Sequence, residues 1–556
     1  MISVNFRLIS AACKCFEDAP VDSFARFSGG TSLQNDLFAF GAALSAAESA
    51  KFALHMDSEL APYITVYRVE SVAVALPTYA FNTDSDYLHD KQPGRYPDLM
   101  RPLAAGELFP LTAGKTASFR FEINVPENAA AGVYPINVAL SDASGARIAE
   151  EMLRLEIFPA VLPEQKLIYT EWFHCDCLAT YYNVEPLSEE HWRIIENFAA
   201  TAVKNGVNML LMPVFTPPLD TAVGGERPTV QLVGVTKKSA GDYAFDFSLV
   251  DRWLAMCERI GVRYHEISHL FTQWGAEHAP KIMATVDGVY TKLFGWETDS
   301  LSEEYLSFLR QFLAALKAYL RGKGLLDKTM FHISDEPSRE HLERYRKLRE
   351  ALDESFDGCI CADALSSYDF YADGAVAHPI VATDHIEPFL QNRVPNLWCY
   401  YCCSQHEKVS NRFIAMSMNR ARVIGTQLFK FRLEGFLHWG YNFYYSQYST
   451  HPIDPYVCND GGWVPAGDAF SVYPAPDGTA YPSLHLMGFT EALHDLRAFE
   501  LLASLTSHAA VVTLIEAVAG MPLTFSEYPR DDTFAERVRE AVNREIDKAA
   551  GALNHK

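Results

Sequence analysis

The 556-residue sequence predicts a multidomain α/β protein with an N-terminal β-sandwich, a (β/α)8 TIM-type barrel and a short helical C-terminal tail. The chain is too long for one ordinary domain. Short alternating segments separated by turn residues fill residues 1–162, which is typical of a sandwich. From about residue 165, strand-like and helix-like segments alternate instead. We therefore expect a sandwich domain at 1–162, a catalytic barrel at 163–505 and a helical extension at 506–556.

The first domain is predicted from strands with one apolar face. Apolar and polar residues alternate in four segments, which are residues 3–9, 63–75, 118–125 and 133–140. Turn signals such as Gly29-Gly30 and Pro93-Gly94 separate such segments. None of them carries a catalytic pattern, so we expect a structural or substrate-shaping role. Pro159 and Leu162-Pro163 mark the expected domain boundary.

The barrel is predicted from eight strand candidates, at residues 167–174, 208–215, 264–270, 330–336, 359–365, 379–385, 397–403 and 435–442. The clearest helical segments between them are residues 188–205, 247–260, 302–321, 338–355 and 411–432. Eight alternations in about 300 residues favour a closed barrel over an open sheet. Long insertions, among them residues 216–246 and 271–300, follow the second, third and eighth strands and would crowd one barrel mouth.

A pair of adjacent acids ends the fourth strand candidate. Phe331 and Ile333 alternate with polar residues, Asp335-Glu336 follow, and Pro337 suits the start of a helix. Neighbouring carboxyls cannot both ionise easily, so their pKa values separate. We expect the helix N-terminus to keep Asp335 charged and Glu336 to be the neutral proton donor. The alternative is that Asp335 caps the helix and Glu336 is a solvated first-turn acid.

Polar and aromatic residues end the other strand candidates as well, and a barrel would bring them together. They are Glu171, Trp172, His174, Glu266, His269, Asp363, Asp384, His385, Tyr400, Tyr401, Trp439, Tyr441 and Asn442. Trp439 and Tyr441 are the preferred sugar-stacking wall. His332 and His438 have a simpler interpretation as hydrogen-bonded core histidines.

Composition excludes several classes of partner. A formal net charge of −23 argues against nucleic acid and anionic membranes. No run of about 20 apolar residues predicts a membrane span, and the N-terminus has no signal-peptide pattern. The 11 cysteines, several in apolar strands, suggest reduced thiols and a cytoplasmic location. Cys175-x-Cys177 beside His174 lacks zinc-site spacing, so we expect no metal and no cofactor.

Several motifs resemble glycoside hydrolase family 123, the β-N-acetylgalactosaminidases. HISDEP at 332–337 is similar to its catalytic motif, and EGFLHWGYN at 434–442 and GDAFSVYPAP at 467–476 are similar to its later segments. PGRYPDLMRPL at 93–103 and VPENAAAGVY at 125–134 resemble its N-terminal sandwich. The resemblance runs to about residue 500. His485 departs from it, because an arginine is expected there.

The resemblance implies a hydrolase that removes a terminal β-linked 2-acetamido sugar with retention. Glu336 would be the general acid, and Asp335 would hold the acetamido group that attacks the anomeric carbon, so no enzyme nucleophile is needed. The expected substrate-binding residues are Trp439, Tyr441, Asn442, Trp274, Tyr400, His385, Glu266 and His174. Gln273, Trp274 and Lys281, in one insertion, could contact a substrate substituent. A small glycan is the expected partner, and self-association is possible.

Two other hypotheses remain open from the sequence. One is a glycosidase of other specificity with Glu336 as acid and Glu266 or Asp384 as second carboxylate. Such a pair would stand about 5–5.5 Å apart in a retaining enzyme and about 6.5–9.5 Å apart in an inverting one. The other is a non-catalytic carbohydrate-binding or scaffolding protein with an open groove. The tail from about Thr506 suggests only packing or assembly.

Overall fold

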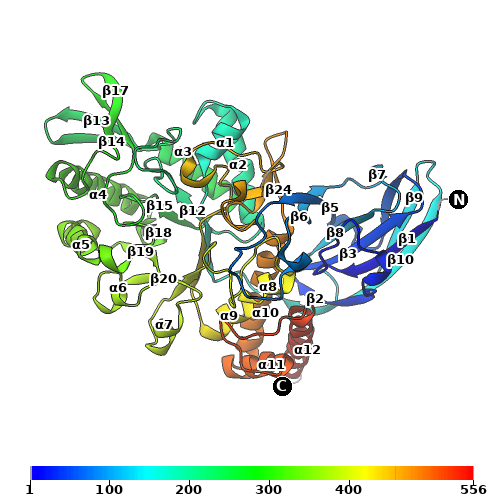
Figure 1. Ribbon diagram of the computed structural model, residues 1–556. Helices are drawn as coiled ribbons and strands as arrows, with labels where there is room; N and C mark the ends of the chain where they lie inside the picture. The colour runs from blue at the N-terminus through cyan, green and yellow to red at the C-terminus, as the bar shows by residue number, and fades with distance from the viewer. Residues whose placement is uncertain (1–2, 458, 555–556) are drawn as a thin grey trace.

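The computed structural model describes residues 3–457 and 459–554, and its first part is built from two β-sheets (Figure 1). One sheet is antiparallel throughout and contains, in spatial order, β1 (Val4–Ser10), β3 (Asp36–Ala46), β8 (Thr116–Val125), β5 (Ile64–Val74) and β6 (Gly94–Pro102). The other contains β2 (Gly29–Gln34), β10 (Arg147–Val161), β9 (Gly132–Asp142), β4 (Ala50–Asp57) and β7 (Phe109–Leu111).

The two sheets share one apolar core. Phe40 and Phe121, on neighbouring strands of the first sheet, stack with ring centroids 4.6 Å apart. Ile136 and Leu153 of the second sheet belong to the same buried cluster. The alternating pattern in the sequence therefore reflects strands with one face turned to this core.

Eight parallel strands form a closed barrel in the second part of the chain. They are β11 (Ile168–Glu171), β12 (Met209–Met212), β15 (Tyr264–Ile267), β18 (Thr329–Phe331), β19 (Ile360–Leu365), β20 (His378–Ala382), β21 (Trp398–Tyr400) and β22 (Gly435–His438). Each overlaps one of the predicted strand segments. β22 pairs with both β21 and β11 and so closes the barrel. A side chain at Gly435 would collide with the Trp398 ring, which explains the glycine there.

The prediction of a (β/α)8 TIM-type barrel is wrong, because the helices do not form a regular outer layer. The connections after the fifth and sixth strands hold only the short helices α6 (Asp369–Ala372) and α7 (Glu387–Gln391). The predicted helix 411–432 begins as irregular chain and is then split into α8 (Met418–Arg422) and α9 (Ile424–Phe431). The strand periodicity in the sequence is strong, but these connections are too short or too irregular for full covering helices.

The longer helices between the barrel strands overlap helical segments predicted from the sequence, except the first, which was not predicted. They are α1 (Cys175–Tyr182), α2 (Glu189–Lys204), α3 (Ser248–Ile260), α4 (Glu303–Lys323) and α5 (Leu342–Phe356). The Ser188 hydroxyl caps α2 by accepting a hydrogen bond from the His191 N–H, 3.3 Å away. Gly261 ends α3 in the left-handed region, with φ of 91°.

Two insertions build a small sheet beside the barrel. In spatial order its strands are β14 (Asp242–Asp246), β13 (Gly234–Ser239), β16 (Ile282–Val286) and β17 (Val289–Phe294), at the upper left of Figure 1. A shorter hairpin, β23 (Val472–Pro474) with β24 (Ala480–Pro482), follows the eighth barrel strand. The insertions therefore extend the carboxyl-terminal side of the barrel strands.

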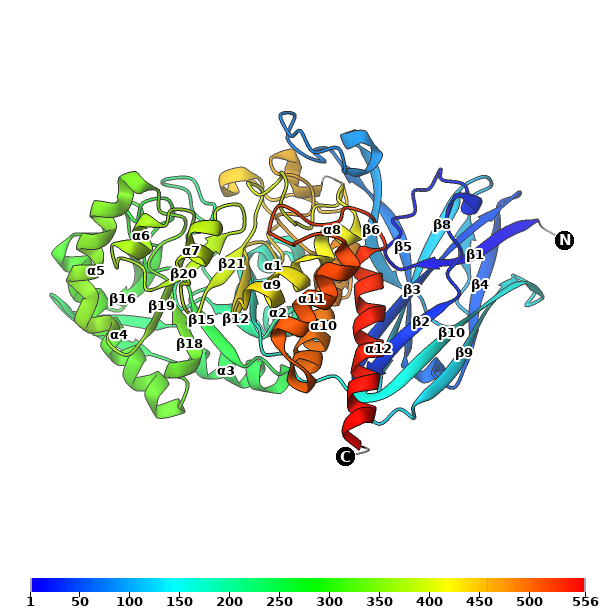
Figure 2. The same ribbon diagram turned by 90° about the horizontal axis from the view of Figure 1, so that it is seen from below.

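Three helices end the described chain: α10 (Leu484–Leu505), α11 (His508–Ala519) and α12 (Phe534–Asn554). In Figure 2, α12 stands between the barrel and the two sheets, and it packs on α10 as well as on β2 and β10. The helical tail predicted from the sequence is therefore the junction between the two parts of the protein.

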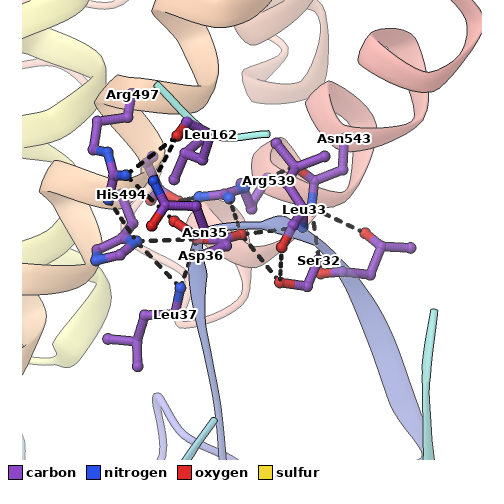
Figure 3. Close-up of polar contacts among 12 residues, drawn as sticks. Ser32, Leu33, Asn35, Asp36, Leu37, Leu162, His494, Arg497, Arg539 and Asn543 are labelled. Carbon is purple, nitrogen blue, oxygen red and sulfur yellow. Dashed lines mark hydrogen bonds and ion pairs between the residues drawn. The ribbon is translucent and has the colours of Figure 1, made fainter. Parts of the chain in front are cut away.

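Asp36 is the centre of this junction (Figure 3). Its carboxylate pairs with Arg539 of α12 and, at 3.0 Å, with His494 of α10. Ser32 and the Leu33 N–H also donate to it. Burial opposes ionisation of Asp36, but the guanidinium and imidazole groups outweigh burial and lower the pKa of the carboxyl.

His485, which replaces the expected arginine, makes a second link between the two parts. Its Nδ1 lies 2.8 Å from Oδ1 of Asp98 on β6, and its Nε2 lies 3.0 Å from the Phe470 carbonyl oxygen. Both side chains are buried. The departure from the family pattern thus lies at a structural contact outside the walls of the pocket described below.

Among the described residues, no helix is both long and apolar enough to cross a bilayer. Ten cysteines within them carry free thiols, and Cys458 lies outside the described residues.

Candidate active site

Asp335 and Glu336 lie just beyond the end of the fourth barrel strand. β18 ends at Phe331, and the next five residues run as irregular chain to the mouth of the barrel. Glu336 has a φ of 41°, a left-handed conformation that is unusual for glutamate. Such strain is typical of residues that a functional site holds in one orientation. Both carboxyl groups line a cavity of about 120 Å³.

The helix expected at 338–355 is present, but Pro337 is not its first residue. Ser338 is the cap of a short 3-10 helix at Arg339–His341, and α5 begins only at Leu342. Asp335 is therefore not a helix cap, and the helix-dipole reason for its negative charge does not apply. Glu336 is not a solvated first-turn acid either, because it forms part of the cavity wall.

Burial governs the electrostatics of the pair. It raises the pKa of Asp335 well above the ordinary value, and the neighbouring Glu336 raises it further, whereas His332 opposes the shift. Burial also raises the pKa of Glu336, the Tyr400 hydroxyl opposes this, and Asp384 adds to it. The cavity without substrate thus favours retention of a proton by the pair.

A buried charged layer lies beneath the pair. His332 Nε2 contacts Glu266, and its Nδ1 lies 3.4 Å from Oδ1 of Asp363. Burial favours a neutral ring, but these two carboxylates outweigh burial and raise the pKa of His332 to about 10. His332 is therefore a buried imidazolium at neutral pH. His332 is thus a hydrogen-bonded core histidine, as predicted. Its charge also lowers the pKa of Asp335.

The same layer fixes the backbone and one cavity wall. The Ile333 N–H donates to Asp363 at 3.0 Å, and the Tyr345 hydroxyl donates to the other oxygen of that carboxylate. Glu266 accepts from Trp172 Nε1 at 2.8 Å. Because Trp172 lines the cavity, Glu266 orients the wall from below without forming part of it.

Five aromatic side chains form part of the cavity wall. Trp172, Trp274, Tyr400, Trp439 and Trp463 line it together with Asp335 and Glu336. The indole N–H of Trp439 donates to Asp468 at 2.9 Å, so the ring is held in place. Burial raises the pKa of Asp468 to about 7. Aromatic faces beside two acids are the chemistry expected of a sugar-binding cavity.

Several predicted site residues do not line this cavity. Tyr441 is buried and donates to the Phe198 carbonyl at 2.8 Å. Asn442 and the backbone of His174 hydrogen-bond to each other, at 2.9 and 3.1 Å. His385 is exposed and pairs with Asp384 at 2.8 Å. The strand-end rule is too coarse for these positions, because side chains at a strand end alternate between the barrel interior and the outer layer.

A second group of residues lies around an arginine side chain. It consists of His174, Asp176 and Cys177. Their possible ligand atoms lie within 4.8 Å of one another. The Arg227 guanidinium bonds both oxygens of Asp176, at 2.5 and 2.7 Å, and its Nη2 lies 3.4 Å from His174 Nδ1. Burial and this cation lower the pKa of His174 to about 4. The cluster is therefore built around the arginine side chain.

The cavity also contains residues that the strand-end argument missed. Asp220, Gln273 and Trp463 come from insertions, and Cys402 and Cys403 follow the seventh barrel strand. The Asp220 N–H donates to Oε1 of Gln273 at 2.6 Å, and its Oδ2 accepts from the Tyr448 N–H at 3.0 Å. Irregular insertions have no periodicity that would place Asp220 or Trp463, whereas Gln273 was a predicted contact to a substrate substituent.

Comparisons with known proteins found a matching family model and a similar fold. The family model described as the catalytic domain of glycoside hydrolase 123 matches residues 172–502. A solved family 123 glycoside hydrolase from Clostridium perfringens, studied for glycolipid glycan hydrolysis, has a TM-score of 0.74 and 14% identity. The match covers 100% of this chain and 99% of that one. A β-glucuronidase from Parabacteroides merdae has a TM-score of 0.32 and 12% identity, with 88% and 51% coverage. No curated protein matched.

Proposed function

The chain belongs to glycoside hydrolase family 123, and from this premise we propose that it releases a terminal β-linked 2-acetamido sugar, preferably N-acetylgalactosamine. We propose a retaining, substrate-assisted reaction through an oxazolinium ion. The observation that carries the proposal is the Asp335–Glu336 pair in a small cavity walled by aromatic rings. A cavity of about 120 Å³ suits one terminal sugar, hence exo action.

In the first step, Glu336 donates its proton to the glycosidic oxygen. The acetamido carbonyl oxygen of the substrate attacks the anomeric carbon, the glycosidic bond breaks, and the rest of the glycan leaves as an alcohol. Asp335 accepts a hydrogen bond from the acetamido N–H and stabilises the positive charge of the oxazolinium ion. Glu336 then removes a proton from water, and the water oxygen attacks the same carbon. The bond from that carbon to the acetamido oxygen breaks, which regenerates the acetamido group and the β configuration.

The neighbours of the two acids support part of this division of roles. The His332 cation favours ionised Asp335, which is the form that accepts the acetamido N–H. Asp384 opposes ionisation of Glu336, which favours the protonated form needed to begin the reaction. Burial, Glu336, Asp363 and Glu266 nevertheless raise the pKa of Asp335, so we propose that the acetamido N–H of the substrate supplies part of the stabilisation of its ionised form.

A glycosidase that uses Asp384 as its second carboxylate is the alternative with some support, since Asp384 influences the pKa of Glu336. Glu266 has less support, because the buried groups Thr170, Trp172 and His332 occupy its carboxylate. Asp384→Asn distinguishes the two mechanisms. We expect it to retain most activity on 2-acetamido substrates, whereas the alternative requires a loss comparable to that of Glu336→Gln.

The direct test is a panel of p-nitrophenyl β-glycosides with and without the 2-acetamido group. We expect hydrolysis of the 2-acetamido sugars only, with β-anomeric product in the first NMR spectra. Glu336→Gln should lower kcat/KM by about 10²–10⁴-fold, the usual contribution of general acid catalysis. Glu343→Gln is a matched control, because its side chain is 79% exposed. Equal activity of wild type and Glu336→Gln would refute the proposal.

We also propose that the enzyme acts in the cytoplasm. The ten free thiols of the described residues support this, since reducing compartments keep such groups unpaired. Cell fractionation with an antibody to the protein tests the location.

A further inference from the structure

A second cavity adjoins the catalytic one across the Trp274 side chain. Its volume is about 330 Å³, and it shares Gln273 and Trp274 with the catalytic cavity. Its other aromatic walls are Trp296 and Tyr448. The rings of Trp274 and Tyr448 meet edge to face, with centroids 5.8 Å apart. We call this second cavity the Trp296 chamber.

Three insertions hold the chamber in shape. Gln273 and Tyr448 both bond to Asp220, so the chain segments after β12, β15 and β22 meet at one residue. Trp296 donates from its indole N–H to the Gly225 carbonyl at 3.0 Å. The Trp274 N–H donates to the Asp335 carbonyl at 3.1 Å, which ties the chamber to the catalytic pair. The chamber is thus held by hydrogen bonds between the insertions and adjoins the catalytic cavity.

Two polar atoms in the chamber wall have no partner within the described residues. Gln273 Nε2 is buried and unbonded, although Oε1 of the same side chain accepts from Asp220. His278 Nδ1 is also buried and unbonded, and its ring meets Trp296 at 5.8 Å. Burying polar nitrogen atoms without partners costs free energy, so these atoms point to a ligand with hydroxyl groups.

The charges around the chamber further restrict the chemical class of the ligand. Glu277 is the acid among the lining residues, whereas Lys281 is not one of them and contacts the Arg227 carbonyl and Glu226 instead. Glu277 would repel an anionic ligand, and among the described residues that line the chamber there is no lysine or arginine to compensate. Flat aromatic walls with two unsatisfied nitrogen atoms suit a neutral sugar ring, which offers apolar C–H faces and hydroxyl groups.

We infer that the Trp296 chamber binds the neutral hexopyranose next to the cleaved bond, as an aglycone subsite. The enzyme would then distinguish oligosaccharides from glycosides with small or lipid-like leaving groups. This inference rests on the proposed function, because it concerns the part of the substrate that leaves when Glu336 donates its proton.

The test compares three substrates that share the same terminal 2-acetamido-2-deoxy-β-galactosyl unit. The glycosyl fluoride has no aglycone ring, the disaccharide carries galactose, and the octyl glycoside carries an alkyl chain. Trp296→Ala and His278→Ala should lower the ratio of kcat/KM for disaccharide to that for fluoride by at least about tenfold, which is typical of losing an aromatic anchor. Trp296→Phe should retain most of the ratio, which excludes a general folding defect.

Tyr290→Ala is the matched control, since this aromatic side chain is 62% exposed on β17. It should leave the ratio unchanged. A ratio equally unchanged in Trp296→Ala, or an octyl glycoside that the wild type prefers over the disaccharide, would overturn the inference alone. Failure of the wild type to hydrolyse the fluoride would instead refute the proposed function.

Discussion

The hydroxyl group of Tyr400 donates a hydrogen bond of 2.5 Å to Oε1 of Glu336. Tyr400 ends β21, so the seventh barrel strand positions the acid that follows the fourth. The bond stabilises the ionised carboxylate and therefore opposes the rise in the pKa of Glu336 that burial causes. The same contact that orients the acid also sets how readily it releases its proton.

Tyr400→Phe should move the alkaline limb of the pH–kcat/KM profile upward. Without the hydroxyl, the pKa of Glu336 rises further, and the protonated acid persists to higher pH. Steady-state rates across pH on a 2-acetamido glycoside measure the shift. Tyr401→Phe is the control, because the buried Tyr401 hydroxyl has no hydrogen-bond partner within the described residues. A downward shift in Tyr400→Phe would contradict the assignment of Glu336 as the acid.

Asp335→Ala should weaken the binding of a thiazoline analogue of the oxazolinium ion more than it weakens the binding of the free sugar product. The analogue carries the ring that Asp335 is proposed to stabilise, and such analogues bind far more tightly than substrates. We expect the inhibition constant for the thiazoline to rise at least about 100-fold and that for the free sugar much less. Equal losses for both ligands would assign Asp335 only a packing role. Inhibition assays in Glu336→Gln provide a comparison in which the acetamido contact is intact.

His332→Gln should destabilise the protein by about 3–5 kcal/mol, because it leaves Glu266 and Asp363 buried without their cation. The pKa of His332 is raised from 6.5 to about 10. Its contribution to stability is therefore fully present below pH 6.5 and is lost as pH rises towards 10. Calorimetry should show a fall in Tm over this range in wild type and a smaller fall in the variant.

The control for that experiment is His385→Gln, since the His385 side chain is 55% exposed. It should leave both Tm and its dependence on pH close to wild type. Identical pH dependence in wild type and His332→Gln would exclude His332 as the buried cation.

Arg539→Met should loosen the junction between the two parts of the protein. The buried Asp36 would lose its main cation, at a cost of about 3–5 kcal/mol. A lower Tm and earlier proteolysis near α12 are the expected results. Arg544 lies on the same helix, but its side chain is 52% exposed. Arg544→Met should therefore lower the free energy of unfolding by less than about 1 kcal/mol. A stable Arg539→Met variant would show that α12 docks through its apolar contacts alone.

The sequence was most informative where periodicity and residue chemistry coincide. Alternation over residues 331–334, followed by two adjacent acids, indicated a strand near the cavity, although β18 ends at Phe331 and the two acids follow on irregular chain. Trp439 and Tyr400 reached the cavity for the same reason. Tyr441 and Asn442 did not, because a strand end specifies the edge of the barrel and not the direction of each side chain.

The charge state of Asp335 could not be predicted from the sequence, for a different reason. It depends on His332, whose own charge depends on Glu266 and Asp363 from two other strands. Such long-range electrostatic coupling has no local pattern. The helical layer was mispredicted because the connections after β19 and β20 are short, and closure of the barrel comes from strand pairing instead.

The position of α12 has a consequence for biosynthesis. Thr31 and Glu540 are 509 residues apart in the chain, yet they are hydrogen-bonded at 2.6 Å. During translation, the sheets and the barrel emerge long before the segment that fastens them to each other. The charged surface around Asp36 therefore remains exposed in the nascent chain until α12 has been synthesised. Chaperones have their longest opportunity to bind in that interval.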